Sequence, residues 1–335
     1  MKLRLGVAGL GEAWERRHRT ALRALADRFE VKAIYDQVRH RAELAAAEFN
    51  AAVVDGYHAL TAREDIDAIF VSSSQWSGPL PVLAACRAGK AVYFGSGVDM
   101  ELSVAEGVKS RVAESGIAFM VEFPRRQAPA TLRLKELIAT RLGMPRLLFC
   151  HRRLPIVEPA NHLRDGSQPT TRQELVELVD WCRYVVGKAP RWVTGVAHHG
   201  GGSGSQIEYR MMSLDFSDSR PGTGPIAQLS CGRYVPGRWS EAVSYRPVAA
   251  MQISCEHGIA FIDLPATLVW FDEAGRHHES LESERPVGEQ LLMQFFRAVT
   301  SLVTKTCDLD DAYQALRIVE QAADSAREGR RVALE

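Results

Sequence analysis

The chain has 335 residues, and its 41 lysines and arginines are balanced by 41 aspartates and glutamates. Apolar residues make up 46% of the chain and charged residues 24%, which is the composition of an ordinary globular protein. The neutral balance argues against a nucleic-acid partner and against binding to an anionic membrane. No apolar run approaches the ~18 residues that a transmembrane helix needs, so we expect no membrane-spanning segment.

The cysteines and the first residues of the chain bear on its cellular compartment. Six scattered cysteines form no Cys-x-x-Cys pair: Cys86, Cys150, Cys182, Cys231, Cys255 and Cys307. Such usage fits reduced, mostly buried thiols and disfavours a structural metal site. The apolar stretch at the start stops at Glu12, which is too early for a secretory signal peptide. We therefore expect a cytoplasmic protein.

The first part of the chain alternates short apolar runs with helical stretches. Strands are predicted at 3–8, 31–35, 52–54, 66–72, 91–94 and 118–122, and helices at 14–28, 39–49, 79–88 and 104–115. Continuous apolar strands separated by helices are typical of a parallel sheet that is covered on both faces. Residues 1–122 are therefore predicted to form a doubly wound α/β domain that binds a dinucleotide.

The second part, residues 123–335, has a different pattern. A helix is predicted at 129–140, and runs with β character follow at 146–151, 192–197, 206–216, 226–234, 249–255, 259–263 and 267–271. Neighbouring strands joined by turn signals favour a large, mostly antiparallel sheet. Two helices, 288–300 and 310–328, close the chain. We expect an α+β domain here.

A glycine-rich loop joins the first strand to the first helix. Gly9 and Gly11 let the backbone approach a pyrophosphate, and the helix start offers free N–H groups. Asp36 ends the second strand, where a carboxylate accepts hydrogen bonds from an adenosine ribose and repels a 2′-phosphate. NAD is thus preferred over NADP, although Arg39 and His40 nearby weaken this preference. The predicted cofactor contacts here are Gly9, Leu10, Gly11, Glu12, Ala13 and Asp36.

The loop departs from the dinucleotide-binding pattern at its third small residue. Trp14 places a bulky indole where helix and strand pack closely in that pattern. A glycine-rich turn that binds nothing is therefore an alternative interpretation of this segment.

Short segments spread over nearly the whole chain share a further order and spacing. They are Gly9-Leu-Gly11, Arg17-His18, Ile34-Tyr35-Asp36, 66–71, 88–92, 121–126 with Pro129, 180–187 and 311–332. This arrangement resembles the Gfo/Idh/MocA family of NAD(P)-dependent oxidoreductases. The resemblance implies a Rossmann domain followed by an α+β domain whose open sheet often forms oligomer contacts, here a homodimer or homotetramer. It also implies a sugar, an inositol or a related polyol as substrate.

The family usually carries Glu-Lys-Pro after the strand that corresponds to residues 91–94. The lysine lies beside the nicotinamide and helps to move the hydroxyl proton. Here the three positions are Gly95, Ser96 and Gly97. A serine of ordinary pKa cannot give or take this proton without an activating partner. We therefore expect the role of the lysine to be lost.

The second family motif places an aspartate, a histidine and another aspartate on one helical face. Anchored on Asp180, these positions correspond to Gln173, Glu177 and Asp180. Two hypotheses follow. In the first, the chemistry is altered: Glu177 is the base, with a pKa raised by burial, while Ser96, Arg126 and Gln173 contact the substrate. In the second, the protein binds a nucleotide or sugar without turnover, as a regulatory or scaffold protein.

Several further residues are candidates for ligand contacts. Ser72, Ser73 and Ser74 follow a predicted strand, where the carboxyl ends of parallel strands border the ligand. Trp76 is a candidate for stacking on a ring, and His162 lies in an irregular stretch suited to a loop over the substrate. Asp180 is also a candidate substrate contact, although the polar edge of a helix is an alternative for it. For the Arg125–Arg126 pair, anion binding and a surface salt bridge both remain open.

Overall fold

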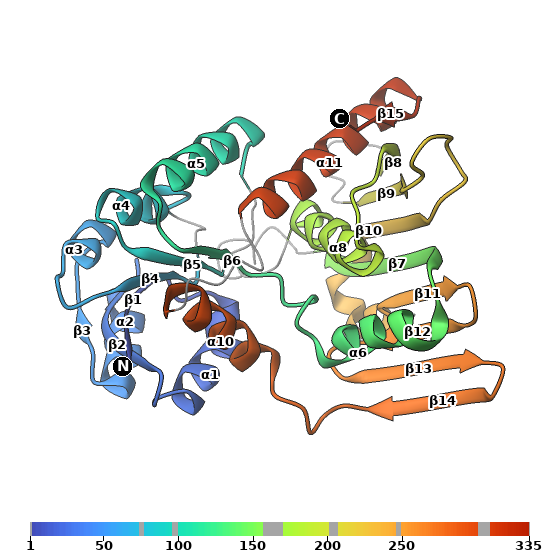
Figure 1. Ribbon diagram of the computed structural model, residues 1–335. Coiled ribbons are helices and arrows are strands. Elements are labelled where there is room, and N and C mark those ends of the chain that lie inside the picture. Colours follow the sequence, from blue (N-terminus) through green and yellow to red (C-terminus); the bar gives the residue numbers. More distant parts are fainter. Residues whose placement is uncertain are drawn as a thin grey trace. The chain divides into compact units, whose positions relative to one another are not determined.

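The structure is a computed structural model that describes residues 2–73, 77–95, 100–156, 170–200, 207–245, 249–300 and 309–334 (Figure 1). Its contacts divide the chain into two units. Unit 1 comprises Met1–Pro124 and Pro286–Tyr313, and unit 2 comprises Arg125–Arg285 and Gln314–Glu335. The segment 286–313, which the sequence analysis placed in the second domain, thus groups with the first unit. The domain boundaries at 122 and 123 stay a prediction.

Unit 1 contains a six-stranded sheet in the order β3-β2-β1-β4-β5-β6, and all of its strand pairs are parallel. The strands are β1 (Leu3–Ala8), β2 (Phe29–Tyr35), β3 (Ala52–Val53), β4 (Ala68–Val71), β5 (Ala91–Phe94) and β6 (Phe119–Val121). Every residue of β4, β5 and β6 is buried. These strands form because their apolar side chains are covered on both faces of the sheet.

Helices lie on both faces of this sheet (Figure 1). They are the π-helical turn η1 (Trp14–His18), α1 (Arg19–Ala24), α2 (Arg39–Phe49), α3 (Tyr57–Thr61), α4 (Leu80–Arg87), α5 (Leu102–Ser115) and α10 (Val287–Thr300). Helix α10 packs on α1, and α4 packs on both α3 and α5. Helix α5 ends at Gly116, which has a φ of 64°, the left-handed conformation that glycine adopts without steric cost.

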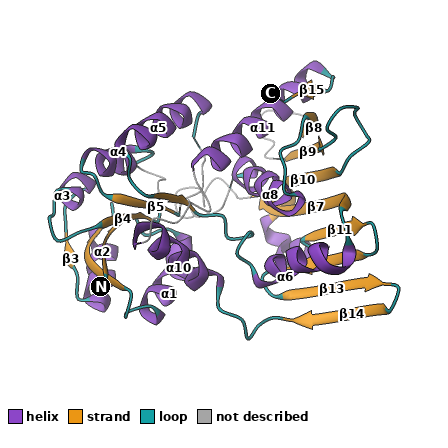
Figure 2. Cartoon of the chain, viewed as in Figure 1, coloured by secondary structure: helices purple, strands orange, loops and turns teal. Residues whose placement is uncertain are grey.

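Unit 2 contains a nine-stranded sheet in the order β14-β13-β12-β11-β7-β10-β9-β8-β15 (Figure 2). The strands are β7 (Pro145–Ile156), β8 (Trp192–His199), β9 (Glu208–Asp215), β10 (Ile226–Pro236), β11 (Met251–Cys255), β12 (Ile259–Asp263), β13 (Thr267–Asp272), β14 (Gly275–Ser280) and β15 (Val332–Ala333). Strands β7 and β10 are parallel, while the other pairs in this sheet are antiparallel.

Helices cover one face of the second sheet (Figure 1). They are α6 (Pro129–Leu137), which continues into the π-helical turn η2 (Ile138–Leu142), α8 (Thr171–Val186) and the unit 2 part of α11 (Leu309–Glu328). Helix α8 packs on β10 and β7, and α6 packs on β12 and β13. A short helical stretch follows β10, with η3 (Gly237–Trp239) and α9 (Ser240–Ser244).

The predicted fold class is confirmed: a doubly wound parallel sheet is followed by a large, mostly antiparallel one. Five elements were not predicted, namely α3, η3, α9, β14 and β15. Strand β14 reads Gly-Arg-His-His-Glu-Ser, so no apolar alternation marks it. Within the described residues, no helix is both long enough and apolar enough to cross a membrane.

Candidate functional site

The glycine-rich loop of unit 1 fits tightly against the carboxyl end of β4. Gly9 has a φ of 76°, and a Cβ added to it would lie 2.6 Å from the carbonyl oxygen of Ser73. A Cβ on Gly11 would lie 3.1 Å from the Cβ of Ser73. The helix begins immediately afterwards at Glu12, and its first N–H groups have no intrahelical partners. The start of the helix can therefore bind an anion. The two glycines beside it have no side chains that would keep such a ligand from the backbone.

Asp36 holds this loop from the end of β2. Its Oδ2 accepts the backbone N–H of Leu10 at 2.7 Å, and its Oδ1 accepts the N–H of Val38 at 2.9 Å. A carboxylate has about four acceptor positions, so two remain for the hydroxyls of a ribose. Asp36 therefore fixes the loop and keeps capacity for a nucleoside.

The carboxyl end of β4 adds a buried hydroxyl to the same place. Ser72 is buried, and its Oγ forms no hydrogen bond within the described part of the chain. A buried hydroxyl without a protein partner calls for a polar ligand or water. The loop, Asp36 and Ser72 together fit the diphosphate and ribose groups of a dinucleotide. Ser73 packs against both glycines, and Ser74 lies outside the described residues.

Trp14 belongs to η1 and is directed into the core of unit 1. Its side chain is fully buried, and its ring centroid lies 5.6 Å from that of Phe49 in α2. A π-helical turn is wider than an α-helical one, and this turn contains the indole. The bulky residue at the third position of the motif therefore packs on α2. Glu12 forms an ion pair with Arg16, at 2.5 Å.

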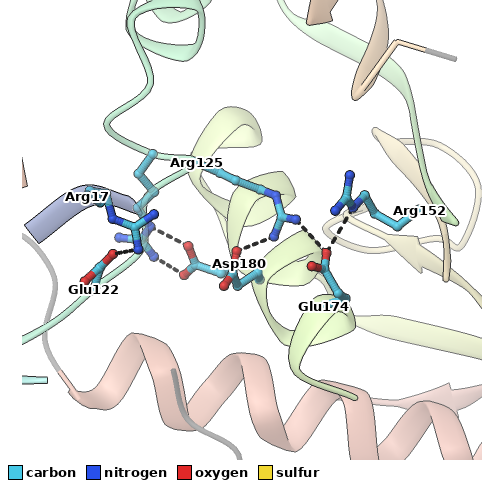
Figure 3. A network of polar contacts seen from close by, with 8 residues as sticks. Arg17, Glu122, Arg125, Arg152, Glu174 and Asp180 are labelled. Carbon is cyan, nitrogen blue, oxygen red and sulfur yellow. Dashed lines mark hydrogen bonds and ion pairs between the residues drawn. The ribbon is translucent and has the colours of Figure 1, made fainter. Parts of the chain in front are cut away.

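A second polar cluster of unit 1 surrounds Glu122, which follows β6. The side chain of Glu122 is 2% exposed, and it forms an ion pair with Arg17 (Figure 3). Its Oε2 lies 2.6 Å from Nε2 of His18 and accepts the hydroxyl of Tyr93 at 2.9 Å. Burial acts to raise the pKa of Glu122, but the charges of Arg17 and His18 outweigh it and lower the pKa to about 2.

In unit 2, two consecutive arginines bind carboxylates of α8 (Figure 3). Arg125 donates to Glu174 at 2.6 Å and to Glu177. Arg126 donates its Nε to Asp180 at 2.7 Å and pairs with it a second time through Nη2. Positions 174, 177 and 180 are three residues apart, which places them along one side of the helix.

Glu174 links this network to the sheet. It is buried and also accepts Nε of Arg152, from β7, at 3.2 Å. Burial acts to raise the pKa of Glu174, but the charges of Arg125 and Arg152 lower it. Burial likewise opposes the charge of Arg125, whose pKa is nevertheless raised by Glu177 and Glu174. The arginines and carboxylates thus stabilise one another's charged forms.

Residues 3–123 match the family model described as "Oxidoreductase family, NAD-binding Rossmann fold", which is the Gfo/Idh/MocA model. The match assigns the Rossmann part of the chain, residues 3–123, to the Gfo/Idh/MocA oxidoreductase family. The resemblance seen in the sequence is confirmed, and so is the NAD-binding class of this domain.

Curated relatives match about half of the chain or less. Dehydrogenase aclE of Aspergillus oryzae is 30% identical over 146 residues, which are 41% of this chain and 40% of that protein. Inositol 2-dehydrogenase of Acidothermus cellulolyticus is 30% identical over 184 residues, 53% of this chain and 51% of that protein. The chain thus spans roughly 40–50% of the length of these two relatives.

Solved structures of other proteins share the complete fold. An oxidoreductase from Thermotoga maritima has a TM-score of 0.81 at 19% identity and covers 99% of this chain and 98% of its own. Aldose-aldose oxidoreductase from Caulobacter crescentus has a TM-score of 0.80 at 16% identity, with complete coverage of both chains. At these identities the likeness shows the fold alone.

The structure brings together some of the predicted catalytic and substrate-binding residues. Glu177 and Asp180 share a helix, and Asp180 and Arg126 contact each other directly. Gln173 has a different environment, because its side chain accepts the N–H of Thr170 at 2.9 Å and so completes the capping box of α8. Ser96, Trp76 and His162 lie outside the described residues.

Burial decides between the alternatives that the sequence left open for the charged residues. The side chain of Asp180 is 1% exposed, so it is no solvated helix edge. Arg126 is also buried, and its contact with Asp180 is therefore an internal salt bridge and not a surface one. The side chain of Glu177 is 32% exposed, which leaves it accessible beside the buried pairs.

Sequence reasoning missed Glu174 and Glu122 as members of these clusters. The spacing of Glu174 and Glu177 on a predicted helix was a usable signal, since residues three apart share a face. The signal for Glu122 was weaker, because it consists only of a carboxylate directly after an apolar strand. Neither pattern names the arginine partners, which come from distant segments of the chain.

Proposed function

We propose that this protein is an NAD-dependent oxidoreductase that acts on a hydroxyl of a sugar or polyol derivative. The observation that carries the proposal is the loop Gly9–Gly11, held by Asp36 at the end of β2. The matched family model describes an NAD-binding domain, and an inositol 2-dehydrogenase is among the relatives. A carboxylate at position 36 disfavours the 2′-phosphate of NADP, so NAD is the proposed cofactor.

The residues that would hold NAD are those of the loop and the two strand ends around it. N–H groups at the helix start, including those of Glu12 and Ala13, would bind the diphosphate, and Asp36 the adenosine ribose. Ser72 has a free hydroxyl for the same ligand. When bound, the nicotinamide supplies the hydride acceptor of the reaction.

Glu177 is the proposed base that takes the proton of the substrate hydroxyl. Arg125 donates to Glu177 with one Nη and to Glu174 with the other, so the guanidinium is fixed in place. This arrangement orients the Glu177 carboxylate, which is the form that accepts a proton. Ser96, Gln173, Arg126, Asp180, Trp76 and His162 are the proposed substrate contacts.

A binding protein without turnover is the second candidate. Two observations favour it: serine replaces the lysine of the family motif, and Gln173 completes a helix cap. The closed pairing of Arg126 with Asp180 points the same way, because neither group is exposed. Such a protein would bind nucleotide or sugar as a regulatory or scaffold protein.

A turnover assay separates the two candidates. Purified protein is incubated with NAD and a panel of inositols, aldoses and sugar nucleotides while the nicotinamide absorbance is followed. We expect reduction with at least one carbohydrate, and about 100-fold or greater loss of kcat in Glu177→Gln, since general base catalysis is worth about that much. Glu106→Gln, on the exposed surface of α5, is the control. Ligand-induced thermal stabilisation with no turnover on any substrate would support the binding protein instead.

The proposed partner is a second copy of the chain, bound through the open face of the second sheet. Leu147, Phe149 and Val196 expose large apolar side chains there. The same strands line a hollow of about 320 Å³. Exposed apolar patches of this kind mark interaction sites. We also propose a cytoplasmic location, which suits the five free thiols of the described residues.

A further inference from the structure

Gly95, directly after β5, has its side-chain volume filled by another residue. A Cβ at position 95 would lie 2.8 Å from Oε2 of Glu122, 3.1 Å from Cε1 of Tyr93 and 3.2 Å from Cε1 of His18. Real Cβ atoms essentially never have a neighbour closer than 3.0 Å, so a side chain at position 95 requires the Glu122 carboxylate to shift. The φ of Gly95 is not positive, so its backbone does not require glycine. The Glu122 carboxylate, and not the backbone conformation, therefore limits which side chain fits at this position.

The residue that occupies this volume comes from the neighbouring strand. The backbone N–H of Glu122 donates to the carbonyl oxygen of Phe94 at 2.9 Å, which places the two strand ends side by side. The carboxylate of Glu122 lies beside Gly95, where it contacts Arg17, His18 and Tyr93. Arg17 and His18 belong to η1, in the helix that begins at the dinucleotide loop.

The family motif explains why this position matters. It usually places a glutamate at position 95, directly before the lysine position. Glu122 already occupies the space beside Gly95, and a second carboxylate there would be a buried like charge. A glutamate at position 95 would therefore displace the Glu122 carboxylate from His18 and Tyr93.

We propose that Glu122 supplies, from the end of β6, the carboxylate that the family motif carries at position 95. As a positioning residue, it holds η1 against the ends of β5 and β6. In the sheet order 3-2-1-4-5-6, these strands belong to the second mononucleotide half, the one beyond the Gly9–Gly11 half. Glu122 thus positions the part of the protein that receives the nicotinamide. This role near the nicotinamide rests on the proposed function. The replacement of a glutamate at position 95 by Glu122, which we call the exchange, does not.

A cycle of variants tests the exchange without any cofactor. Glu122→Ala, Gly95→Glu and the double variant are compared with wild type by denaturant unfolding. We expect each single variant to unfold at a lower denaturant concentration than wild type. We expect the double variant to unfold at a higher concentration than either, because its carboxylate fills the space that Glu122 leaves. A double variant that is not more stable than both single variants would overturn the exchange.

The cycle stays decisive even if one single variant does not fold. If Gly95→Glu does not fold alone, the comparison of the double variant with Glu122→Ala still measures the rescue. A double variant no more stable than Glu122→Ala then overturns the exchange.

A binding experiment tests the positioning role. Glu122→Gln keeps the shape of the side chain and removes its charge, and Glu106→Gln is the matched control on the surface of α5. We expect Glu122→Gln to weaken NADH binding about tenfold, while ADP-ribose, which lacks the nicotinamide, binds as in wild type. A purely structural role would weaken both ligands equally, and that result would overturn the positioning role. A wild type without affinity for NADH would contradict the proposed function and leave the unfolding cycle to decide the exchange.

Discussion

At the scale of residues, the buried charged side chains beside helix α8 are paired with one another. Arg126 and Asp180 bind each other through two contacts, and Glu174 accepts from two arginines. Removing one member of such a pair leaves an uncompensated buried charge, which costs far more than the pair contributes. The pairs therefore fix geometry, and of the α8 carboxylates Glu177 is the one with substantial exposure.

Glu122 gives a pH dependence with a defined sign. Its pKa is lowered from 4.5 to about 2 in the folded protein, where Arg17, His18 and Tyr93 face it. A lowered folded-state pKa stabilises the fold above pH ~4.5, and this stabilisation is lost as the pH falls toward 2. The difference corresponds to roughly 3 kcal/mol.

The measurement is the free energy of unfolding of wild type and Glu122→Gln between pH 7 and pH 2. We expect wild type to have an advantage at pH ~5 that shrinks steadily below pH ~4.5. Carboxylates that both proteins share cancel in this difference, and Glu106→Gln should follow wild type throughout. An advantage that persists undiminished to pH 2 would show that the charge of Glu122 does not stabilise the fold.

At the scale of elements, helix α8 shows how far the sequence leads. The spacing of Glu177 and Asp180 predicted one helical face, and they do lie on one helix beside arginines. Thr170 and Gln173 also match the Ser/Thr-x-x-Glu/Gln capping pattern. The sequence analysis did not use this pattern, because it aligned Gln173 with the family motif. The arginines could not be assigned to their carboxylates, because these contacts join segments about 50 residues apart.

Strands and helices were predictable where one periodicity dominated. Strands β1, β5 and β12 and helix α2 have the bounds that the sequence predicted, since apolar runs and turn residues delimit them. Strand β14 is polar on both faces, and the single-turn helix α3 is too short to show a period. The parallel pairing of β7 with β10 was also unpredictable, because it depends on the crossover and not on either strand.

The open face of the second sheet yields a prediction about assembly. We expect wild type to sediment as a dimer or tetramer, and Phe149→Arg to shift it to a smaller species by placing a charge in the apolar interface. Leu44→Arg, an equally drastic change on the exposed side of α2, is the control and should leave the mass unchanged. A wild type that is monomeric at every concentration would refute assembly through this face.

At the scale of the whole molecule, the fold is shared with other proteins, but residues of the family motif are not. Solved structures with nearly complete coverage share this fold at 16–19% identity, yet the family motif Glu-Lys-Pro reads Gly95-Ser96-Gly97 here. A fold supports many activities, so the activity must be argued from the site. The glycine-rich loop of unit 1 has a geometry that fits a dinucleotide, and helix α8 of unit 2 carries arginine–carboxylate pairs.

The most direct test of this account is an equilibrium titration of nucleotide-free protein with NADH and with NADPH, followed by tryptophan quenching and energy transfer to the nicotinamide. The account predicts saturable binding in the micromolar range, tighter for NADH because Asp36 disfavours the 2′-phosphate. Absence of binding to either nucleotide up to millimolar concentration would contradict it, and the protein would then be no NAD-dependent oxidoreductase.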